Sequence, residues 1–305
     1  MRGSKWIADE VKFESAKELL HTLGPRNELW KPHSSEWVFR GISDLEEHKL
    51  LPTAYRPGAF EGLIDPSHPD TVSARPKAAA ECPINELEKE RWLVGQFAEK
   101  SSEAGLSLPL DHPLITRSIG EQYEDKDLDL NLWALWALAR HHGLPSSLLD
   151  WTRRPLVAAY FAATNSHQEK IPTGQLGVWA LRRPKQVSCF VEWDDDYNPP
   201  RIGRLRFYDP QTVTNPNLQA QSGLFTILRV EGFPPVDKYI ENLDDHELER
   251  MDRPPPIMRL FSLPREHASE LLRLLSDEGI HGASMFPGYD GVVRYLKERA
   301  QHGSG

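Results

Sequence analysis

The sequence predicts an α+β fold, in which a helical N-terminal half packs on a mixed or antiparallel sheet. Two observations predict this class. Two dense apolar segments with helical spacing come first, LNLWALWALARHHG and RPLVAAYFAATNS. The second half holds short apolar runs that read as strands, separated by loops rich in proline and aspartate. These runs cover residues 176–181, 204–209, 224–230 and 257–263.

The elements before the two core helices are predicted from local signals. Residues 8–23 carry apolar side chains at mostly helical spacing and end at Gly24-Pro25, which predicts a helix. The stretch WVFRG at 37–41 is typical of a buried strand. Residues 61–83 are rich in proline, serine and alanine, which predicts a surface loop or mobile insert. Residues 85–100 follow as a helix.

The core helices and the C-terminal helices carry clear boundary signals. Gly143 stands where a helix C-cap glycine belongs, and Pro155 occupies a favoured position at the start of the next helix. Residues 265–279 form an amphipathic pattern that stops at a glycine, and DGVVRYLKERA predicts a last helix. We find no internal repeat, so the expectation is a lead-in of residues 1–33 followed by one domain over 34–300.

Composition narrows the class of function. The chain has 305 residues, of which 39% are hydrophobic and 27% charged, as in a globular protein. Its net charge of −9, without a dense basic block, argues against general DNA binding. No apolar run approaches the roughly 20 residues of a membrane span. Cys82 and Cys189 form neither a disulfide framework nor a zinc site, so a cytoplasmic protein without a metal is expected.

Arg40 is the first candidate site residue. It follows Trp37, Val38 and Phe39, so its guanidinium starts close to an apolar core. A charge buried there without a partner costs several kcal/mol, in the range of about 3–5 kcal/mol when a pair is broken. The partner is either a carboxylate of the protein or an anionic ligand, and the sequence leaves both open.

A second candidate region joins the two core helices. The ten residues 143–152 include two serines, a carboxylate and an indole, and His141 and His142 precede them. Asp150 or Thr152 is well placed to cap the second helix by accepting its free N–H groups. Buried polar groups need partners, which are either internal or supplied by a ligand.

These two regions resemble the FRG domain family of bacterial and phage proteins. The family has an aromatic-Arg-Gly motif, here Phe39 to Gly41, and an HHG-L-P-x-x-LLDWT-x-x-P-L-x-A-x-YFA signature, here within 141–162. Residues 215–227 and 279–296 also resemble it, so the FRG domain is expected to span 34–300. The family commonly has Thr-Arg after Pro145, whereas this chain has Ser146-Ser147, so one guanidinium is missing.

The order of these pieces is also similar to that of ADP-ribosyltransferases. That similarity implies a split-sandwich fold in which Arg40 binds the phosphates of the cofactor NAD and Thr152 belongs to the strand beside the nicotinamide. It places Gln221 where those enzymes have a ribose-binding residue, and Asp150 is the carboxylate that would replace its missing charge. His141, His142, Trp151 and Tyr160 complete the candidate cofactor-binding residues.

Each candidate also has a structural interpretation. Arg40 can pair internally, Asp150 and Thr152 can act as helix caps, and Trp151 can be core. Two hypotheses remain for the function. One is an NAD-using ADP-ribosyltransferase or NAD glycohydrolase, such as a toxin or phage-defence effector acting on a protein or nucleic-acid acceptor. The other is a non-catalytic module that senses a nucleotide-type small molecule.

Overall fold

The computed structural model describes nine stretches of the chain. They are residues 7–31, 34–64, 86–109, 130–166, 173–183, 205–209, 216–228, 234–241 and 256–301. Contacts divide the chain into two compact units. The first contains Met1–Leu50, Asp150–Phe225 and Pro234–Gly305, and the second contains Leu51–Leu149 and Thr226–Phe233. Most of the insert expected at 61–83 lies outside the described residues.

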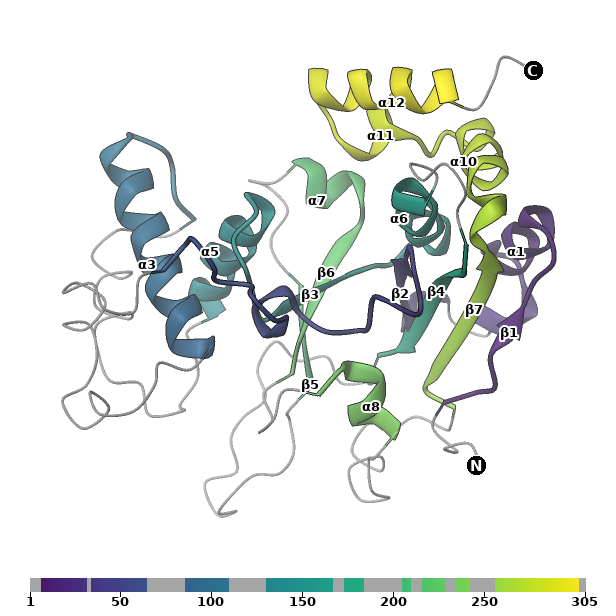
Figure 1. Ribbon diagram of the computed structural model, residues 1–305, viewed down its shortest axis with the longest axis horizontal. Coiled ribbons are helices and arrows are strands. Elements are labelled where there is room, and N and C mark those ends of the chain that lie inside the picture. Colours follow the sequence, from purple (N-terminus) through teal and green to yellow (C-terminus); the bar gives the residue numbers. More distant parts are fainter. Residues whose placement is uncertain are drawn as a thin grey trace. The chain divides into compact units, whose positions relative to one another are not determined.

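A seven-stranded sheet is the main β structure, in the order β1-β7-β4-β2-β3-β6-β5 (Figure 1). β1 runs parallel to β7, whereas β2 pairs antiparallel with β3 and β4, and β4 pairs antiparallel with β7. The sheet is therefore mixed, and the predicted α+β class is confirmed. The strands are β1 (Val11–Lys12), β2 (Trp37–Ile42), β3 (Leu148–Thr152), β4 (Gln175–Arg182), β5 (Leu205–Tyr208), β6 (Gly223–Leu228) and β7 (Met258–Pro264).

Three helices of the first unit share a core with one face of β2, β4 and β7. They are α1 (Ala16–Leu23), α6 (Pro155–Ser166) and α10 (Ala268–Asp277). Alternate strand residues such as Phe39, Val178 and Phe261 enter this core, as the two-residue period of a strand requires. Gly41 lies where α6 crosses β2 so closely that a Cβ atom would sit 1.9 Å from the carbonyl oxygen of Ala158.

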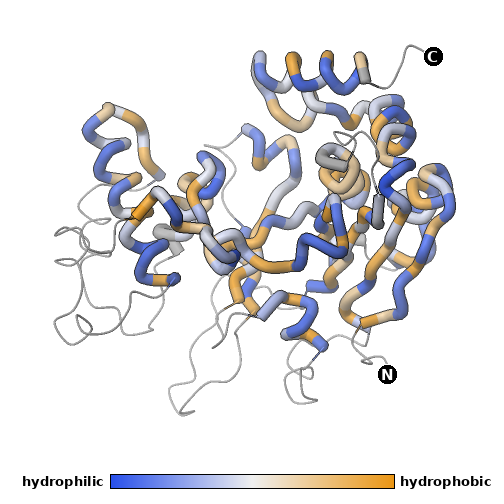
Figure 2. Tube along the Cα trace, in the orientation of Figure 1, coloured by the Kyte–Doolittle hydropathy of each residue, from blue (hydrophilic) through white to orange (hydrophobic). Residues whose placement is uncertain are grey.

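The first unit also contains four short or peripheral helices. These are α7 (Pro216–Ala220), α8 (Val236–Glu241), α11 (Gly282–Met285) and α12 (Tyr289–Gln301). Hydrophilic and hydrophobic segments alternate along α12 (Figure 2), as the amphipathic pattern of its sequence predicts. Strand β2 starts directly after a short 3₁₀ turn at Ser34–Glu36.

The described part of the second unit is mostly helical, with the ends of β3 and β6 as its strand residues. It contains α3 (Glu86–Glu103), α5 (Leu130–His141) and a 3₁₀ turn at Thr53–Tyr55. Gly143 follows α5 with φ of 95°, the left-handed conformation expected of a C-cap glycine. No helix among the described residues is both long enough and apolar enough to cross a bilayer.

The N-terminal prediction needs one correction. The expected helix over 8–23 begins only at Ala16, because Ser15 Oγ accepts the Glu18 N–H at 3.3 Å and caps it there. Val11 and Lys12 instead form β1 and pair with Phe261 and Ser262 at the edge of the sheet. A strand of two residues is too short to show a periodic pattern in the sequence. β1 forms because the edge of β7 offers it unpaired backbone groups.

Candidate functional site

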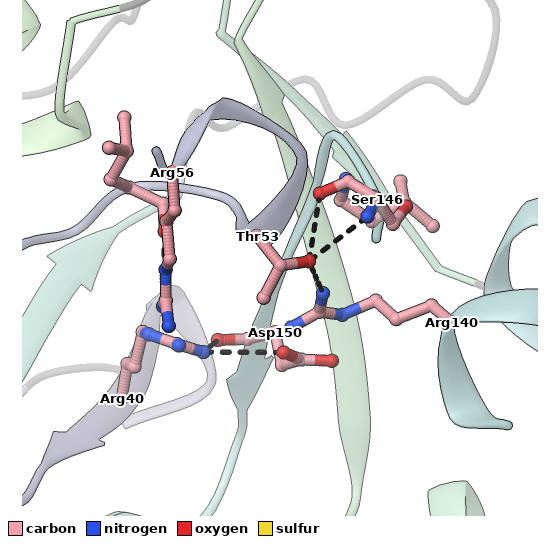
Figure 3. Close-up of polar contacts among 8 residues, drawn as sticks. Arg40, Thr53, Arg56, Arg140, Ser146 and Asp150 are labelled. Atoms are coloured by element: carbon pink, nitrogen blue, oxygen red, sulfur yellow. Dashed lines mark hydrogen bonds and ion pairs between the residues drawn. The ribbon is translucent and has the colours of Figure 1, made fainter. Parts of the chain in front are cut away.

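Arg40 has an internal partner. Its Nη1 atom donates to the carbonyl oxygen of Asp150 at 2.7 Å and to Asp150 Oδ2 at 3.4 Å (Figure 3). Strand pairing explains this contact. β2 is in register with β4 over six residue pairs, whereas its described register with β3 is the pair Phe39–Thr152. The Arg40 guanidinium therefore supplies the Asp150 carbonyl with a donor close to where the ladder ends.

Asp150 and Arg40 differ in their exposure to solvent. The Asp150 side chain is 47% exposed, while that of Arg40 is 15% exposed. The guanidinium lies against the protein and orients a carboxylate that reaches solvent. The pair therefore places a carboxylate, oriented by a guanidinium, at the surface of the first unit.

Thr152 and Gln221 are joined to each other through the backbone. The Thr152 hydroxyl donates to the Gln221 carbonyl oxygen at 2.7 Å and accepts the Arg154 N–H at 3.0 Å, just before α6. The Gln221 side chain donates from Nε2 to the carbonyl oxygen of Met285 at 3.1 Å. Both side chains therefore stabilise the packing of α7, α11 and the start of α6.

The hydrogen bonds join these four residues in two pairs. Arg40 donates to Asp150, and the Thr152 hydroxyl donates to the Gln221 carbonyl oxygen. Strand β3 carries a member of each pair, Asp150 and Thr152.

The remaining candidate residues lie in different settings. Trp151 is 3% exposed and Tyr160 is fully buried, so both belong to the interior. Burial, together with the hydrogen bond to Glu298, raises the pKa of Tyr160 above its usual value of 10.0. In the second unit, His141 and His142 are exposed at the end of α5, and the His142 ring stacks on Phe97 at 6.1 Å.

A polar cluster within the second unit orders the turn that precedes β3. Thr53 Oγ1 accepts from Arg140 Nη1 at 2.9 Å and from the Ser146 N–H at 3.0 Å (Figure 3). Buried Glu90 accepts from the Ser146 hydroxyl at 2.8 Å and from the Ser147 N–H at 2.7 Å. The two serines that replace Thr-Arg in the family signature therefore have structural roles in this chain.

Sequence reasoning did not single out Glu90, Arg140, Thr53 or Arg153. Arg153 donates to the carbonyl oxygens of Ser222 at 3.3 Å and Gly223 at 3.2 Å and pairs with Asp209, which holds the turn between α7 and β6. Their partners lie 56 to 93 residues away, so no local pattern marks them. Glu90 is the exception, because this carboxylate stands at a position of α3 that the helical pattern places on the buried face.

The charged residues of the site determine which ligands it can bind. Among the described residues, no three His, Cys, Asp or Glu side chains gather in a group that could hold a metal ion. Arg40 and Asp150 provide instead a guanidinium and an exposed carboxylate on two adjacent strands. Such a pair can recognise a polar ligand and stabilise a positive charge that develops beside the carboxylate.

Comparison with known proteins adds a family. No curated protein and no solved structure is significantly similar to the chain. The model of the FRG domain family matches residues 35–171, a range that includes both the aromatic-Arg-Gly motif and the 141–162 signature. The segments at 215–227 and 279–296 lie beyond that match. The resemblance seen in the sequence is confirmed, and the chain carries an FRG domain.

Proposed function

We propose that this protein is an NAD-using enzyme of ADP-ribosyltransferase-like chemistry, with Asp150 as its catalytic carboxylate. The observation that carries the proposal is the Arg40–Asp150 pair, in which a mostly buried guanidinium orients a carboxylate that is 47% exposed. Such a carboxylate is accessible to a substrate and does not have to move to meet it. Arg40 is then a positioning residue for Asp150.

The chemical step would use the charge of Asp150. The bond between C1′ of the ribose and the nicotinamide nitrogen breaks, and nicotinamide leaves with the bonding electron pair. The ribose is left as an oxocarbenium ion, which the Asp150 carboxylate stabilises. Water, or a hydroxyl or amine of a protein or nucleic-acid acceptor, then adds to C1′ and loses a proton. Water would give ADP-ribose, and another acceptor would give an ADP-ribosylated product.

A second candidate function is a nucleotide-sensing module without turnover. One observation favours it: Thr152 and Gln221, which the similarity to transferases places in the active site, are occupied by internal hydrogen bonds. In this case Arg40 and Asp150 would bind the nucleotide, and no bond would break.

Nicotinamide release tests the proposal. The wild type incubated with NAD should release nicotinamide, and Asp150→Asn should reduce the rate by about 100-fold or more, because an amide offers no negative charge to a cation. Asp277→Asn is the matched control, because Asp277 Oδ2 also accepts from an arginine, Arg273, at 3.4 Å. A wild type that binds NAD in calorimetry without releasing nicotinamide would support the sensor, and no binding would contradict both.

A second experiment tests the polar segment from His141 to Thr152. His142→Ala should change nicotinamide release less than Asp150→Asn does, because the His142 ring already stacks on Phe97. A melting curve recorded for each variant separates loss of activity from loss of fold. If Asp150→Asn releases nicotinamide as fast as the wild type but melts at a lower temperature, the segment has a structural role and no catalytic one.

The biological role follows from the same chemistry. An enzyme that consumes NAD or modifies an acceptor would harm the cell that makes it, as a toxin or phage-defence effector does. A cytoplasmic location is part of this proposal, since two cysteines form no disulfide framework. Expression of the wild type should slow bacterial growth, and expression of Asp150→Asn should not.

A further inference from the structure

Two guanidiniums flank the Trp37 ring at the start of β2. The Arg182 Cζ atom lies 5.8 Å from the centre of the ring and the Arg259 Cζ atom lies 5.9 Å from it. The sheet register explains why they meet. Arg182 of β4 is the cross-strand partner of Trp37, and Arg259 of β7 is the partner of Ala180, two residues before Arg182. All these side chains therefore leave the same face of the sheet.

The two arginines differ in their ion pairs. Arg182 donates to Glu36 Oε2 from Nε at 3.0 Å and from Nη2 at 2.8 Å. Within the part of the chain that the structure describes, Arg259 has neither an ion pair nor a hydrogen bond, and its Nε atom is buried. Burial, and then the like charge of Arg182, lower the pKa of Arg259 below its usual value of 12.5.

A second unsatisfied donor belongs to the same aromatic group. The Trp30 ring meets the Trp37 ring edge-on, with centroids 5.7 Å apart, and Trp30 is 2% exposed. Its indole Nε1–H is buried and has no acceptor among the described residues. A buried donor without an acceptor is uncommon in folded proteins, and here two residues that contact the Trp37 ring, Trp30 and Arg259, each have one.

Packing alone does not account for Arg259. Stacking on Trp37 satisfies the face of the guanidinium but none of its five N–H donors. A leucine or methionine would fill the same space without a buried donor and without repulsion from Arg182. An oxygen-rich anion would satisfy the donors and balance the extra charge, because a guanidinium binds two oxygens of a phosphate or a carboxylate at once.

We propose that Trp30, Trp37, Arg182 and Arg259, which we term the Trp37 cluster, form a binding site for a small oxyanion. Arg259 supplies the charge and the donors, Arg182 supplies a second positive charge that Glu36 holds in place, and the tryptophan rings keep water away. Phosphate groups and carboxylates share this chemistry. The site is distinct from the Arg40–Asp150 pair, because Trp37 and Arg40 leave opposite faces of β2.

Calorimetry with inorganic phosphate tests the proposal directly. Sodium phosphate should bind the wild type with a stoichiometry of one and raise its melting temperature above that in sodium chloride at equal ionic strength. Sodium acetate in a parallel series distinguishes a carboxylate site from a phosphate site. Arg259→Met should weaken the binding by at least about tenfold, since a charge-assisted hydrogen-bonded contact is lost.

The controls separate a site from a general salt effect. Phosphate stabilises many proteins because it is excluded from their surface. A higher melting temperature of the wild type is therefore not sufficient, and the difference between variants is the evidence for a site. Arg273→Met, a change at an arginine that is 49% exposed on α10, should bind phosphate as the wild type does. Arg259→Lys, which keeps the charge and loses the planar fork, should bind more weakly than the wild type. Absence of saturable binding of either anion, or equal binding by the wild type and Arg259→Met, would overturn the proposal.

Discussion

At the scale of single residues, the question raised by Arg40 has a specific answer. A guanidinium at the end of an apolar strand is held by a main-chain carbonyl as well as by a carboxylate, both from Asp150. The carbonyl is the closer acceptor, at 2.7 Å against 3.4 Å. Arg40 therefore stabilises the junction of β2 and β3 whether or not a ligand is bound.

Replacing Arg40 with lysine should lower the free energy of unfolding by about 1–2 kcal/mol. A lysine ammonium lacks the planar fork and cannot meet the carbonyl and the carboxylate in the same geometry. Urea unfolding measures the change, with Arg273→Lys as a control at an exposed arginine of α10. Equal stability of Arg40→Lys and the wild type would mean that the contact with Asp150 contributes little to folding.

At the scale of elements, close contact between backbones positions the strand that carries Arg40. α6 packs against β2 over Gly41, where no side chain intervenes. In the same unit, a buried carboxylate on α12 binds other elements. Glu298 accepts the Tyr160 hydroxyl at 2.6 Å and the Gly282 N–H at 3.0 Å, which connects α6, α11 and α12.

The Gly41→Ala substitution should destabilise the protein by about 3 kcal/mol or more, because overpacking against backbone atoms cannot be relieved by a rotamer change. The added Cβ would lie 1.9 Å from the Ala158 oxygen and 2.6 Å from the Ala162 nitrogen. Gly62→Ala is the control, since nothing lies within 4 Å of its Cβ position and only its φ of 72° resists the change, at about 1–2 kcal/mol. Similar losses in the two variants, measured by thermal unfolding, would contradict this account of the helix–strand contact.

Removing the Tyr160 hydroxyl should loosen α12. Tyr160→Phe leaves the buried Glu298 with one donor fewer, which should cost about 1–3 kcal/mol. Amide hydrogen exchange in α12 should become faster, whereas Tyr289→Phe, at a position 93% exposed, should change neither stability nor exchange. Because the folded state raises the pKa of Tyr160, the wild type should also lose stability as the pH rises above about 10, and the variant should lose less.

At the scale of the whole molecule, ionisable pairs make stability depend on pH. Arg265 is 5% exposed and donates to Asp44 Oδ2 at 2.8 Å and to the Thr173 carbonyl oxygen at 3.0 Å. Burial acts to raise the pKa of Asp44, but the N–H groups of Glu47 and Glu46 and the charge of Arg265 together lower it below 3.8. Burial raises the pKa of Asp237. At neutral pH the ionised Asp44 therefore stabilises the folded state, whereas the ionised Asp237 destabilises it.

The Asp44→Asn substitution should lower stability at pH 7 by about 2–4 kcal/mol, because the buried Arg265 loses its counter-charge. A depressed folded pKa contributes stability above the unfolded pKa, and this contribution disappears as the pH falls through the folded pKa. The difference from the wild type should therefore shrink below about pH 3.8. Asp237→Asn should show the opposite sign, with a gain at pH 7. Denaturant unfolding from pH 3 to pH 8 measures both, and a difference independent of pH would contradict the assignment.

Local pattern was enough to predict the α+β class, the strand at WVFRG, both core helices and their boundaries at Gly143 and Pro155, because each depends on neighbours within a turn of helix or a few residues of strand. The sequence also identified the FRG domain through its two motifs. Tertiary structure alone decided the partners of the polar residues. Arg40 meets Asp150 across 110 positions, and Thr152 meets Gln221 across 69. Strand order and register bring these residues together, and a two-residue element such as β1 exists only because β7 offers it an edge. Such contacts depend on which segments become neighbours in space, and no periodicity along the chain encodes that.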